Sequence, residues 1–322
     1  MPWSDSTSKW LLFIACLLLS ALGTWTARGY ALRRKMLDQP GERRSHTQPT
    51  PRGGGIGLVV VTLMLLLMLA QQAPVLWGGA ALGLLLVAGI GWWDDHHPLS
   101  ALSRLIVQVC AGGIFAASVA VTNGDLWLVG AAFIAVPVLV NVWNFMDGIN
   151  GMAASQATLA ALALACLLSG VAQLVALAVA AAALGFLPFN FPRARIFLGD
   201  VGSGGLGFLM AMLLVFSMQQ HTPSMWPVLF LPVSAMLADS GITLLWRMRR
   251  GERWWEPHTQ HLYQKLARRY GHVRVSISYA MWTIMAGLSM QLAVSMAAGW
   301  SWLVTILFAA VTLKIWVKLH SQ

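Results

Sequence analysis

Carboxylates are scarce in this sequence, and four of them stand at the ends of long apolar runs. The chain has 11 Asp and Glu residues in 322, and the four are Asp94, Asp95, Asp147 and Asp200. A carboxylate beside hydrocarbon is costly, so acids kept at such places indicate a functional site. Such acids could bind a metal ion, position a phosphate or transfer a proton.

The segment from 141 to 151 has the clearest spacing of polar side chains. Asn141, Asn144 and Asp147 recur every three residues, so their oxygens can lie on one helical face. Gly148 and Gly151 then allow a tight turn. Carboxylate and neutral oxygens suit Mg²⁺, which also keeps water and substrate phosphate as ligands. The alternative is that these residues only cap the end of a helix.

Asp200 lies in a glycine-rich turn, residues 197–205, that opens an apolar segment. Arg193 and Arg195 stand just upstream. Such a turn could hold a diphosphate by its backbone N–H groups while Asp200 holds the cation of that diphosphate.

Asp94 and Asp95 are adjacent at the end of their apolar run and are followed by His96 and His97. Neighbouring side chains on a helix diverge by about 100°, so one acid can meet metal or substrate while the other meets a neighbouring helix or a base. The alternatives are a solvated helix end or a metal patch formed by the two histidines. Acids at a helix C-terminus oppose its macrodipole, which disfavours the solvated end.

The first basic segment carries donors suited to phosphate. These are Arg43, Arg44, His46 and Arg52, followed by the glycine run 53–55. Glycines let backbone N–H groups approach an anion at a helix start. The alternative is a basic loop with a glycine-rich helix entry.

The last large polar segment contains His258 and His261. Pro257 predicts a helix start, and histidines three residues apart would share a face of that helix. Two histidines could bind zinc, but no cysteine or third histidine accompanies them, so phosphate or uracil recognition fits better. Asp239, inside an apolar run, has either a structural partner on a neighbouring helix or a direct role.

The elements that must position these residues are membrane helices. The chain is 58% hydrophobic and 10% charged, whereas a soluble domain carries roughly 25% charged residues. The apolar runs approach the ~20 residues that cross a bilayer and lack the alternation of barrel strands. We expect an all-α bundle of about eleven transmembrane helices in one domain, residues 1–322. The predicted spans are 10–27, 56–70, 76–93, 105–122, 127–143, 152–169, 171–188, 204–218, 226–246, 275–296 and 300–317.

Basic residues predict the orientation of these helices. Every Lys and Arg except Lys9 falls in alternate linkers or near the C-terminus, so the positive-inside rule places the N-terminus outside and the C-terminus inside. The acids and histidines then share the cytoplasmic face. Because most basic residues follow the first span, we expect a retained helix and not a signal peptide. The expected cytoplasmic loops lie near 28–55, 94–104, 144–151, 189–203 and 247–274.

The formal net charge of +10 indicates a lipid surface as a partner. Basic residues beside a membrane attract anionic headgroups at about 1 kcal/mol each. No soluble segment suggests nucleic-acid binding. Cys16, Cys110 and Cys166 lie within apolar spans without metal-ligand spacing, so we interpret them as packing residues.

Taken in order, these motifs resemble the polyprenyl-phosphate N-acetylhexosamine-1-phosphate transferases of glycosyltransferase family 4. The resemblance extends from about residue 38 to residue 264. Its motifs are Asp38 with Pro49-Thr50-Pro51-Arg52-Gly53-Gly54-Gly55, Asp94-Asp95, Asn141 with Asn144 and Asp147-Gly148, Phe197-Leu198-Gly199-Asp200-Val201-Gly202-Ser203, Asp239, and Pro257-His258 with His261.

The resemblance implies an enzyme of the bacterial cytoplasmic (inner) membrane. It would transfer a sugar 1-phosphate from a UDP-N-acetylhexosamine to undecaprenyl phosphate on the cytoplasmic face, release UMP and require Mg²⁺, with Mn²⁺ as a substitute. Asp94, Asp95 and Asp147 would be catalytic, and Asn144 and Asp200 would bind the metal. The residues expected to bind substrate are Asp38, Arg43, Arg44, His46, Arg52, Asn141, Arg193, Arg195, Asp239, His258 and His261.

One departure from the family concerns the histidines. The muramoyl-pentapeptide branch carries consecutive histidines, whereas here single ones are followed by Leu262-Tyr263-Gln264. The chain therefore looks more like the WbpL-like branch that initiates O-antigen or other surface polysaccharides. The sugars used by this branch include 6-deoxy-N-acetylhexosamines. The alternatives are the peptidoglycan step, a secondary transporter and a structural or lipid-binding membrane protein.

Overall fold

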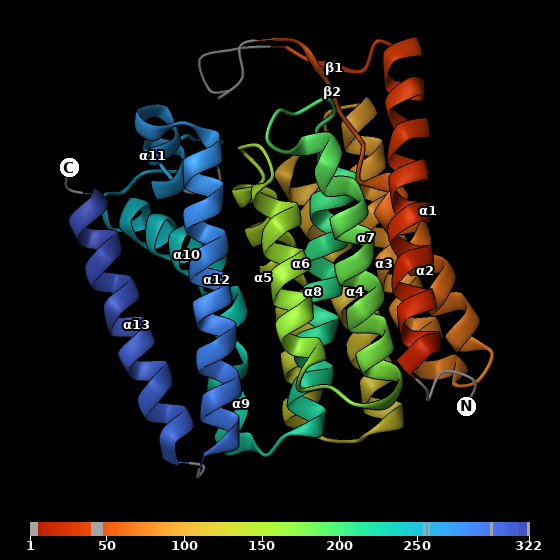
Figure 1. Ribbon diagram of the computed structural model, residues 1–322, viewed down its shortest axis with the longest axis vertical. Helices are drawn as coiled ribbons and strands as arrows, with labels where there is room; N and C mark the ends of the chain where they lie inside the picture. The colour runs from red at the N-terminus through yellow and green to blue at the C-terminus, as the bar shows by residue number, and fades with distance from the viewer. Residues whose placement is uncertain (1–5, 40–47, 254–255, 257, 297–298, 321–322) are drawn as a thin grey trace.

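The computed structural model describes residues 6–39, 48–253, 256, 258–296 and 299–320. Its helices stand side by side in one bundle, and the two chain ends lie at opposite ends of it (Figure 1). An odd number of membrane crossings requires this separation of the chain ends. The first half of the bundle comprises α1 (Ser6–Arg33), α2 (Ile56–Ala70), α3 (Pro74–His96), α4 (Ala101–Thr122), α5 (Leu126–Met146) and α6 (Met152–Ala165).

The predicted membrane helices are confirmed. Among the described residues, nine segments are long and apolar enough to cross a membrane, and the shorter apolar helices α2 and α6 account for the other two predicted spans. The chain is therefore a multi-pass membrane protein. The second half comprises α7 (Gly170–Asn190), α8 (Gly199–Gln220), α9 (Trp226–Leu229), α10 (Ser234–Arg249), α11 (Leu262–Tyr270), α12 (His272–Ser295) and α13 (Gly299–His320).

The predicted span 226–246 is not one continuous helix. Two 3₁₀ turns, η1 (Pro223–Met225) and η2 (Leu231–Val233), flank the four-residue α9 before α10 begins. Pro223, Pro227 and Pro232 supply the reason, because proline lacks the N–H that continues a helix and clashes with the preceding turn.

A short strand pair was not predicted. β1 (Leu37–Asp38) and β2 (Thr50–Pro51) pair antiparallel, with Leu37 opposite Pro51 and Asp38 opposite Thr50. This pair joins the end of α1 to the start of α2 at one end of the bundle (Figure 1).

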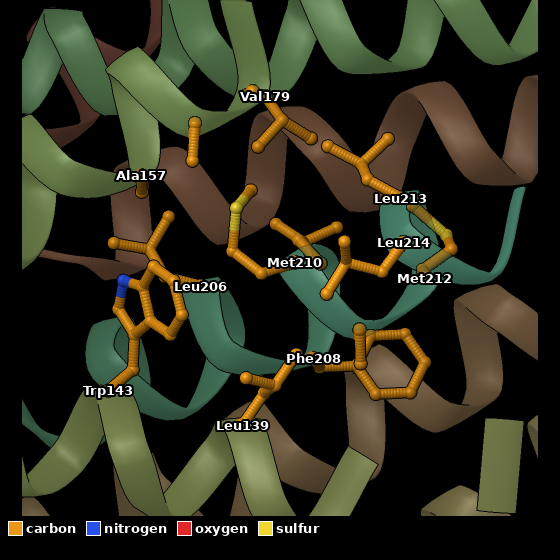
Figure 2. Packing of buried hydrophobic residues seen from close by; sticks show 14 of the residues in the cluster. Leu139, Trp143, Ala157, Val179, Leu206, Phe208, Met210, Met212, Leu213 and Leu214 are labelled. Carbon is orange, nitrogen blue, oxygen red and sulfur yellow. The ribbon is translucent and has the colours of Figure 1, made fainter. Parts of the chain in front are cut away.

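The core of the bundle is α8. Every residue of its apolar window is buried, which is expected of a helix that is apolar on all sides. Leu206 and Met210 lie on the side of α8 that faces Trp143, Ala157 and Val179 of α5, α6 and α7 (Figure 2). Phe208 lies on another side of α8, where its ring packs edge-on against Phe115 of α4 at 5.8 Å. This packing fixes the start of α8, and therefore Asp200, relative to the ends of its neighbours.

Candidate active site

The acids predicted to act together do lie together, at one end of the bundle. Asp94 and Asp95 are in the last turn of α3, Asp147 follows α5, and Asp200 is in the first turn of α8. These helix ends lie at the same end of the bundle as the β1–β2 pair and α11 (Figure 1). We call Asp94, Asp95, Asp147 and Asp200 the acid cluster.

Arg104 of α4 bridges two members of the acid cluster. Its Nη1 lies 2.6 Å from Oδ2 of Asp200 and 3.2 Å from Oδ2 of Asp94. The backbone N–H of Leu99 donates to the other oxygen of Asp94 at 2.5 Å. Arg104 thus holds the α3 end, the α3–α4 connection and the α8 start in register.

Asp95 has a different environment from Asp94. Its two carboxylate oxygens accept the backbone N–H groups of Asp200 and Val201, at 3.1 and 3.2 Å. The side chain of Asp95 is 3% exposed, against 14% for Asp94. Asp95 therefore caps the N-terminus of α8, where a negative charge is favoured, and Asp94 is the more accessible acid.

Several N–H groups of the two glycine-rich segments, which we predicted to bind an anion, donate to other parts of the protein instead. For these N–H groups the prediction is wrong. Gly54 N–H and Gly55 N–H donate to the carbonyls of Phe197 and Leu198, at 2.9 and 2.8 Å. A Cβ on Gly55 would lie 2.3 Å from Cα of Gly202, so these glycines permit two backbones to touch. In the other segment, the first N–H groups of α8 are occupied by Asp95.

Asn144 and Asn141 both point to a small slot between α3, α4, α5 and α8. Asn144 donates to Oδ1 of Asp200 at 3.0 Å, and Asn141 donates to Oε1 of Gln108 at 2.6 Å. The slot has a volume of about 20 Å³ and is lined by both asparagines, Arg104, Gln108 and Asp200. The one-face prediction holds for the two asparagines, whereas Asp147 is the C-cap residue after the last helical turn.

Asp147 lies in a strongly negative environment. Burial raises its pKa well above the ordinary aspartate range, and the charges of Asp200 and Asp95 raise it further. Among the other three acids of the cluster, Asp95 contacts Arg52, and Asp94 and Asp200 contact Arg104. Carboxylate and amide oxygens are the ligand types that a hard divalent cation such as Mg²⁺ prefers, but no three of the described His, Cys, Asp or Glu side chains are already placed to hold a metal.

The two histidines lie beside the end of α5 but do not share a helical face. The predicted helix start at Pro257 lies outside the described residues, and the helix that is described, α11, begins at Leu262 with His261 as its N-cap residue. The rings of His258 and His261 are 4.7 Å apart, and His261 stacks on Phe145 at 6.1 Å.

The environment of both histidines favours the uncharged imidazole. Burial lowers the pKa of His258 to about 4, with smaller contributions from His261 and Arg247. Burial also lowers the pKa of His261, which outweighs the opposing charge of Asp239. The buried Nδ1 of His261 has no hydrogen-bond partner among the described residues. Neutral imidazoles here can donate to or accept from a ligand.

Asp239 positions the histidine segment. Its oxygens accept the N–H groups of Leu262 and Tyr263, at 2.8 and 2.9 Å, and the hydroxyl of Tyr279 at 2.8 Å. Its side chain is 2% exposed. This arrangement agrees with the structural alternative, and the expected direct contact of Asp239 with substrate has no support in it.

Two predicted arginines lie away from the acid cluster. Arg193 and Arg195 are exposed, and the guanidinium of Arg195 donates to the carbonyl of Pro188 and covers the Phe189 ring. Their expected contact with a diphosphate stays a prediction.

The first basic segment is described only at its ends. Asp38 lies in β1, and Arg52 follows β2 and contacts Asp95. Arg43, Arg44 and His46 lie outside the described residues. The alternative metal patch also lacks support, because His96 contacts Tyr30 and Trp92, and the described residues contain no group of three His, Cys, Asp or Glu placed to hold a metal.

Sequence reasoning missed Arg104, Gln108 and Ser203 as members of the site. Arg104 did carry a signal, since it is the only Lys or Arg between Arg52 and Arg193. Gln108 lies one helical turn further along the same helix, and Ser203 accepts from Asn144 at 3.3 Å.

Known proteins are similar in sequence to this region of the chain. The profile described as Glycosyl transferase family 4 matches residues 77–218, which hold the whole acid cluster. Decaprenyl-phosphate N-acetylglucosaminephosphotransferase of Mycobacterium tuberculosis (strain ATCC 25618 / H37Rv) is 29% identical over 329 residues, covering 84% of this chain and 79% of the relative. Phospho-N-acetylmuramoyl-pentapeptide-transferase of Thermosynechococcus vestitus is 31% identical over 246 residues, covering 65% and 64%. Undecaprenyl-phosphate alpha-N-acetylglucosaminyl 1-phosphate transferase of Yersinia pestis is 26% identical over 273 residues, covering 78% and 74%.

Proposed function

Because the chain belongs to glycosyl transferase family 4, we propose that it transfers an N-acetylhexosamine 1-phosphate from a UDP-sugar to undecaprenyl phosphate. An oxygen of the lipid phosphate forms a bond to the phosphorus that carries the sugar. The bond from that phosphorus to the UMP oxygen breaks, so the products are a lipid-linked diphospho-sugar and UMP.

The observation that carries this proposal is the acid cluster with Arg104 at its centre. Arg104 joins Asp94 to Asp200, and Asn144 donates to Asp200. Asp95 accepts the N–H of Asp200, and Asp147 lies close enough to feel the charges of Asp200 and Asp95. This arrangement suits a cation and an anionic substrate. A secondary transporter would instead place its charges near the middle of broken helices. A purely structural membrane protein would not need Asn144 to donate to Asp200.

The chief obstacle to the reaction is electrostatic, because one anionic phosphate must approach another. The lipid phosphate has a second pKa near ~6, so much of it is already a dianion at neutral pH and needs no base. Asp200, Asp147 and Asn144 are the residues that would hold Mg²⁺, which would neutralise charge and polarise the diphosphate when bound. Arg104 holds Asp94 and Asp200 in place for this task.

The finer parts of the proposal concern the sugar and the place of action. Single histidines at 258 and 261, followed by Leu262, favour a polysaccharide-initiating enzyme, such as one for O-antigen, over the peptidoglycan step. The basic linkers favour an active site on the cytoplasmic face of the inner membrane.

The test is UMP release by the purified protein from a panel of UDP-N-acetylhexosamines, including 6-deoxy sugars, with undecaprenyl phosphate. Release should require Mg²⁺, and Mn²⁺ should substitute. Asp200→Asn should lose most activity and also bind Mn²⁺ more weakly by electron paramagnetic resonance, whereas Asp125→Asn, at the opposite end of α5 from Asn144, should do neither. Near-native turnover by Asp200→Asn at ordinary Mg²⁺ concentration would disprove the metal assignment.

A further inference from the structure

The segment Leu262-Tyr263-Gln264, which follows His261, has no task in the reaction steps proposed above. Tyr263 is its largest side chain and is fully buried. It lies in the first turn of α11, where the N–H groups of Leu262 and Tyr263 donate to Asp239 of α10. The main chain of Tyr263 is therefore held by α10, while its hydroxyl contacts a different element.

The hydroxyl of Tyr263 bridges the turn that carries Asp147. It donates to the backbone carbonyl of Phe145 at 2.9 Å, and the backbone N–H of Gly148 donates to the same oxygen. Phe145 precedes Asp147 by two residues, and Gly148 follows it directly. One buried oxygen thus holds the chain on both sides of Asp147.

Glycine at position 148 permits this close approach. A Cβ on Gly148 would lie 2.1 Å from the hydroxyl oxygen of Tyr263, and 3.1 and 3.2 Å from Cζ and Cε2 of its ring. The first distance is impossible between atoms that are not bonded, whereas the other two require only a small shift in a packed interior. The hydroxyl, more than the ring, therefore requires glycine here.

The ring of Tyr263 also packs against the histidine segment. Its centre lies 5.9 Å from the centre of the His261 ring, which in turn lies 6.1 Å from the Phe145 ring. The histidine segment and the turn at Asp147 are therefore joined through one buried side chain.

We propose that Tyr263 is a positioning residue that fixes Asp147 relative to the histidine segment. The inference rests on the proposed function, in which Asp147 belongs to the active site. Because Tyr263 is fully buried, it acts through this turn and not on the substrate itself. A displacement of about 1 Å in a reacting group can cost about 100-fold in rate, so loss of the bridge should slow the reaction more than it weakens substrate binding.

The first test compares the loss of two buried hydroxyls in the full-length protein. Tyr263→Phe removes the bridge, whereas Thr283→Val removes a hydroxyl that donates to Gln156 between α12 and α6. Both variants should lower the thermal unfolding midpoint. Only Tyr263→Phe should lower kcat, by about 10- to 100-fold, with the KM values for both substrates within about twofold of wild type. Wild-type kcat in Tyr263→Phe, or an equal loss of kcat in Thr283→Val, would overturn the inference.

The second test uses the contact between the hydroxyl and Gly148. Gly148→Ala places its Cβ against the hydroxyl oxygen, so this variant should displace the turn and lose most activity. Tyr263→Phe removes that oxygen, and it should therefore raise activity in the Gly148→Ala background although it lowers activity in the wild-type background. Residues that are in contact show such non-additive effects. A loss by the same factor in both backgrounds would overturn the inference.

Hydrogen exchange provides a measurement that does not depend on turnover. In Tyr263→Phe, amides in 145–149 should exchange faster because the N–H of Gly148 loses its acceptor, while amides in 266–270 keep their helical hydrogen bonds and should not change. Unchanged exchange in 145–149 would overturn the positioning role. Faster exchange there, when the wild type releases UMP from no UDP-sugar, would overturn the proposed function and leave the positioning of Asp147 standing.

Discussion

At the scale of single residues, the adjacent acids Asp94 and Asp95 have separate tasks. Asp94 is the more exposed and contacts Arg104, whereas both oxygens of Asp95 accept N–H groups at the start of α8. A helix cap supports the fold, and an accessible acid beside a guanidinium is available to substrate or metal.

We therefore expect Asp94→Asn to lower activity without a large loss of stability, and Asp95→Asn to lower both. Each should cost about 2–3 kcal/mol of transition-state stabilisation, or roughly 30- to 150-fold in kcat/KM. Asp95→Asn should also lower the free energy of unfolding by about 1–2 kcal/mol, because a buried amide NH₂ then faces a backbone donor. Turnover and thermal unfolding measure these two effects.

The pH profile of Asp94→Asn separates positioning from proton transfer. The lipid phosphate has a pKa near ~6, so its dianion is abundant through most of pH 6 to 9. If Asp94 positions charge, the loss of activity should stay nearly constant over this range. Full recovery at high pH would instead identify a general base.

Arg104 should be as important as the acids it holds. Arg104→Gln leaves Asp94 and Asp200 without the guanidinium between them, so we expect a loss of roughly 100-fold in kcat/KM. Arg249→Gln, an exposed arginine at the end of α10, is the matched control and should stay near wild type. Equal activity of the two variants would contradict a role for Arg104.

At the scale of elements, α11 depends on a carboxylate from another helix. Asp239 of α10 caps α11 and also accepts from Tyr279 of α12. The N–H groups that Asp239 accepts belong to the first turn of α11, which directly follows His261. The hydrogen bonds from this turn to Asp239 therefore set where His258 and His261 lie relative to α5.

Asp239→Ala should release α11 from α10. The loss of a cap and of buried hydrogen bonds should cost about 2–3 kcal/mol and leave polar groups unsatisfied. Hydrogen exchange should become faster in 261–270. Asp125→Ala removes the cap of α5 at Trp127, and its exchange should change only near 126–130. Unchanged exchange in α11 of Asp239→Ala would show that other contacts hold this helix.

The histidine segment also predicts a pH dependence of stability. The pKa of His258 is about 4 in the folded protein and near 6.5 when unfolded, so the unfolded chain binds more protons between these values. Stability should therefore fall as pH drops from about 6.5 to 4. The pKa difference sets an upper limit of about 3 kcal/mol on the stability lost over this pH range. Solvent screening of the half-buried side chain reduces the expected loss to roughly 1–2 kcal/mol.

Thermal unfolding from pH 4 to 7.5 tests this sign. His258→Gln should remove part of the acid destabilisation, while His97→Gln, which changes an exposed imidazole, should retain all of it. A wild-type acid profile in His258→Gln would exclude His258 as the cause.

At the scale of the whole molecule, the bundle places every described part of the site at one end. Arg253 lies in the segment before α11 at that end, and His221 follows α8 at the other. Since all basic residues except Lys9 belong to the predicted cytoplasmic segments, a reporter fused after Arg253 should be cytoplasmic and one inserted near His221 external. The reverse result would contradict a site reached by cytoplasmic UDP-sugars.

The sequence alone determined the membrane class, the eleven apolar segments and the acids that end three of them. These follow from composition and spacing, because a membrane helix must satisfy its own backbone and stay apolar over a length set by the bilayer. Asn141 and Asn144 were placed correctly relative to one another for the same reason, since helical spacing is a local property.

Only the tertiary structure decided which partners these residues have. Arg104 is ten residues from Asp94 and far from Asp200 in sequence, yet it joins both. The assignments of Asp95 to the start of α8, and of Asp239 to α11, depend on how separate helices pack. Such contacts depend on side-chain volumes and close backbone approaches across the whole bundle, as at Gly55 and Gly202, and no local pattern in the sequence records them.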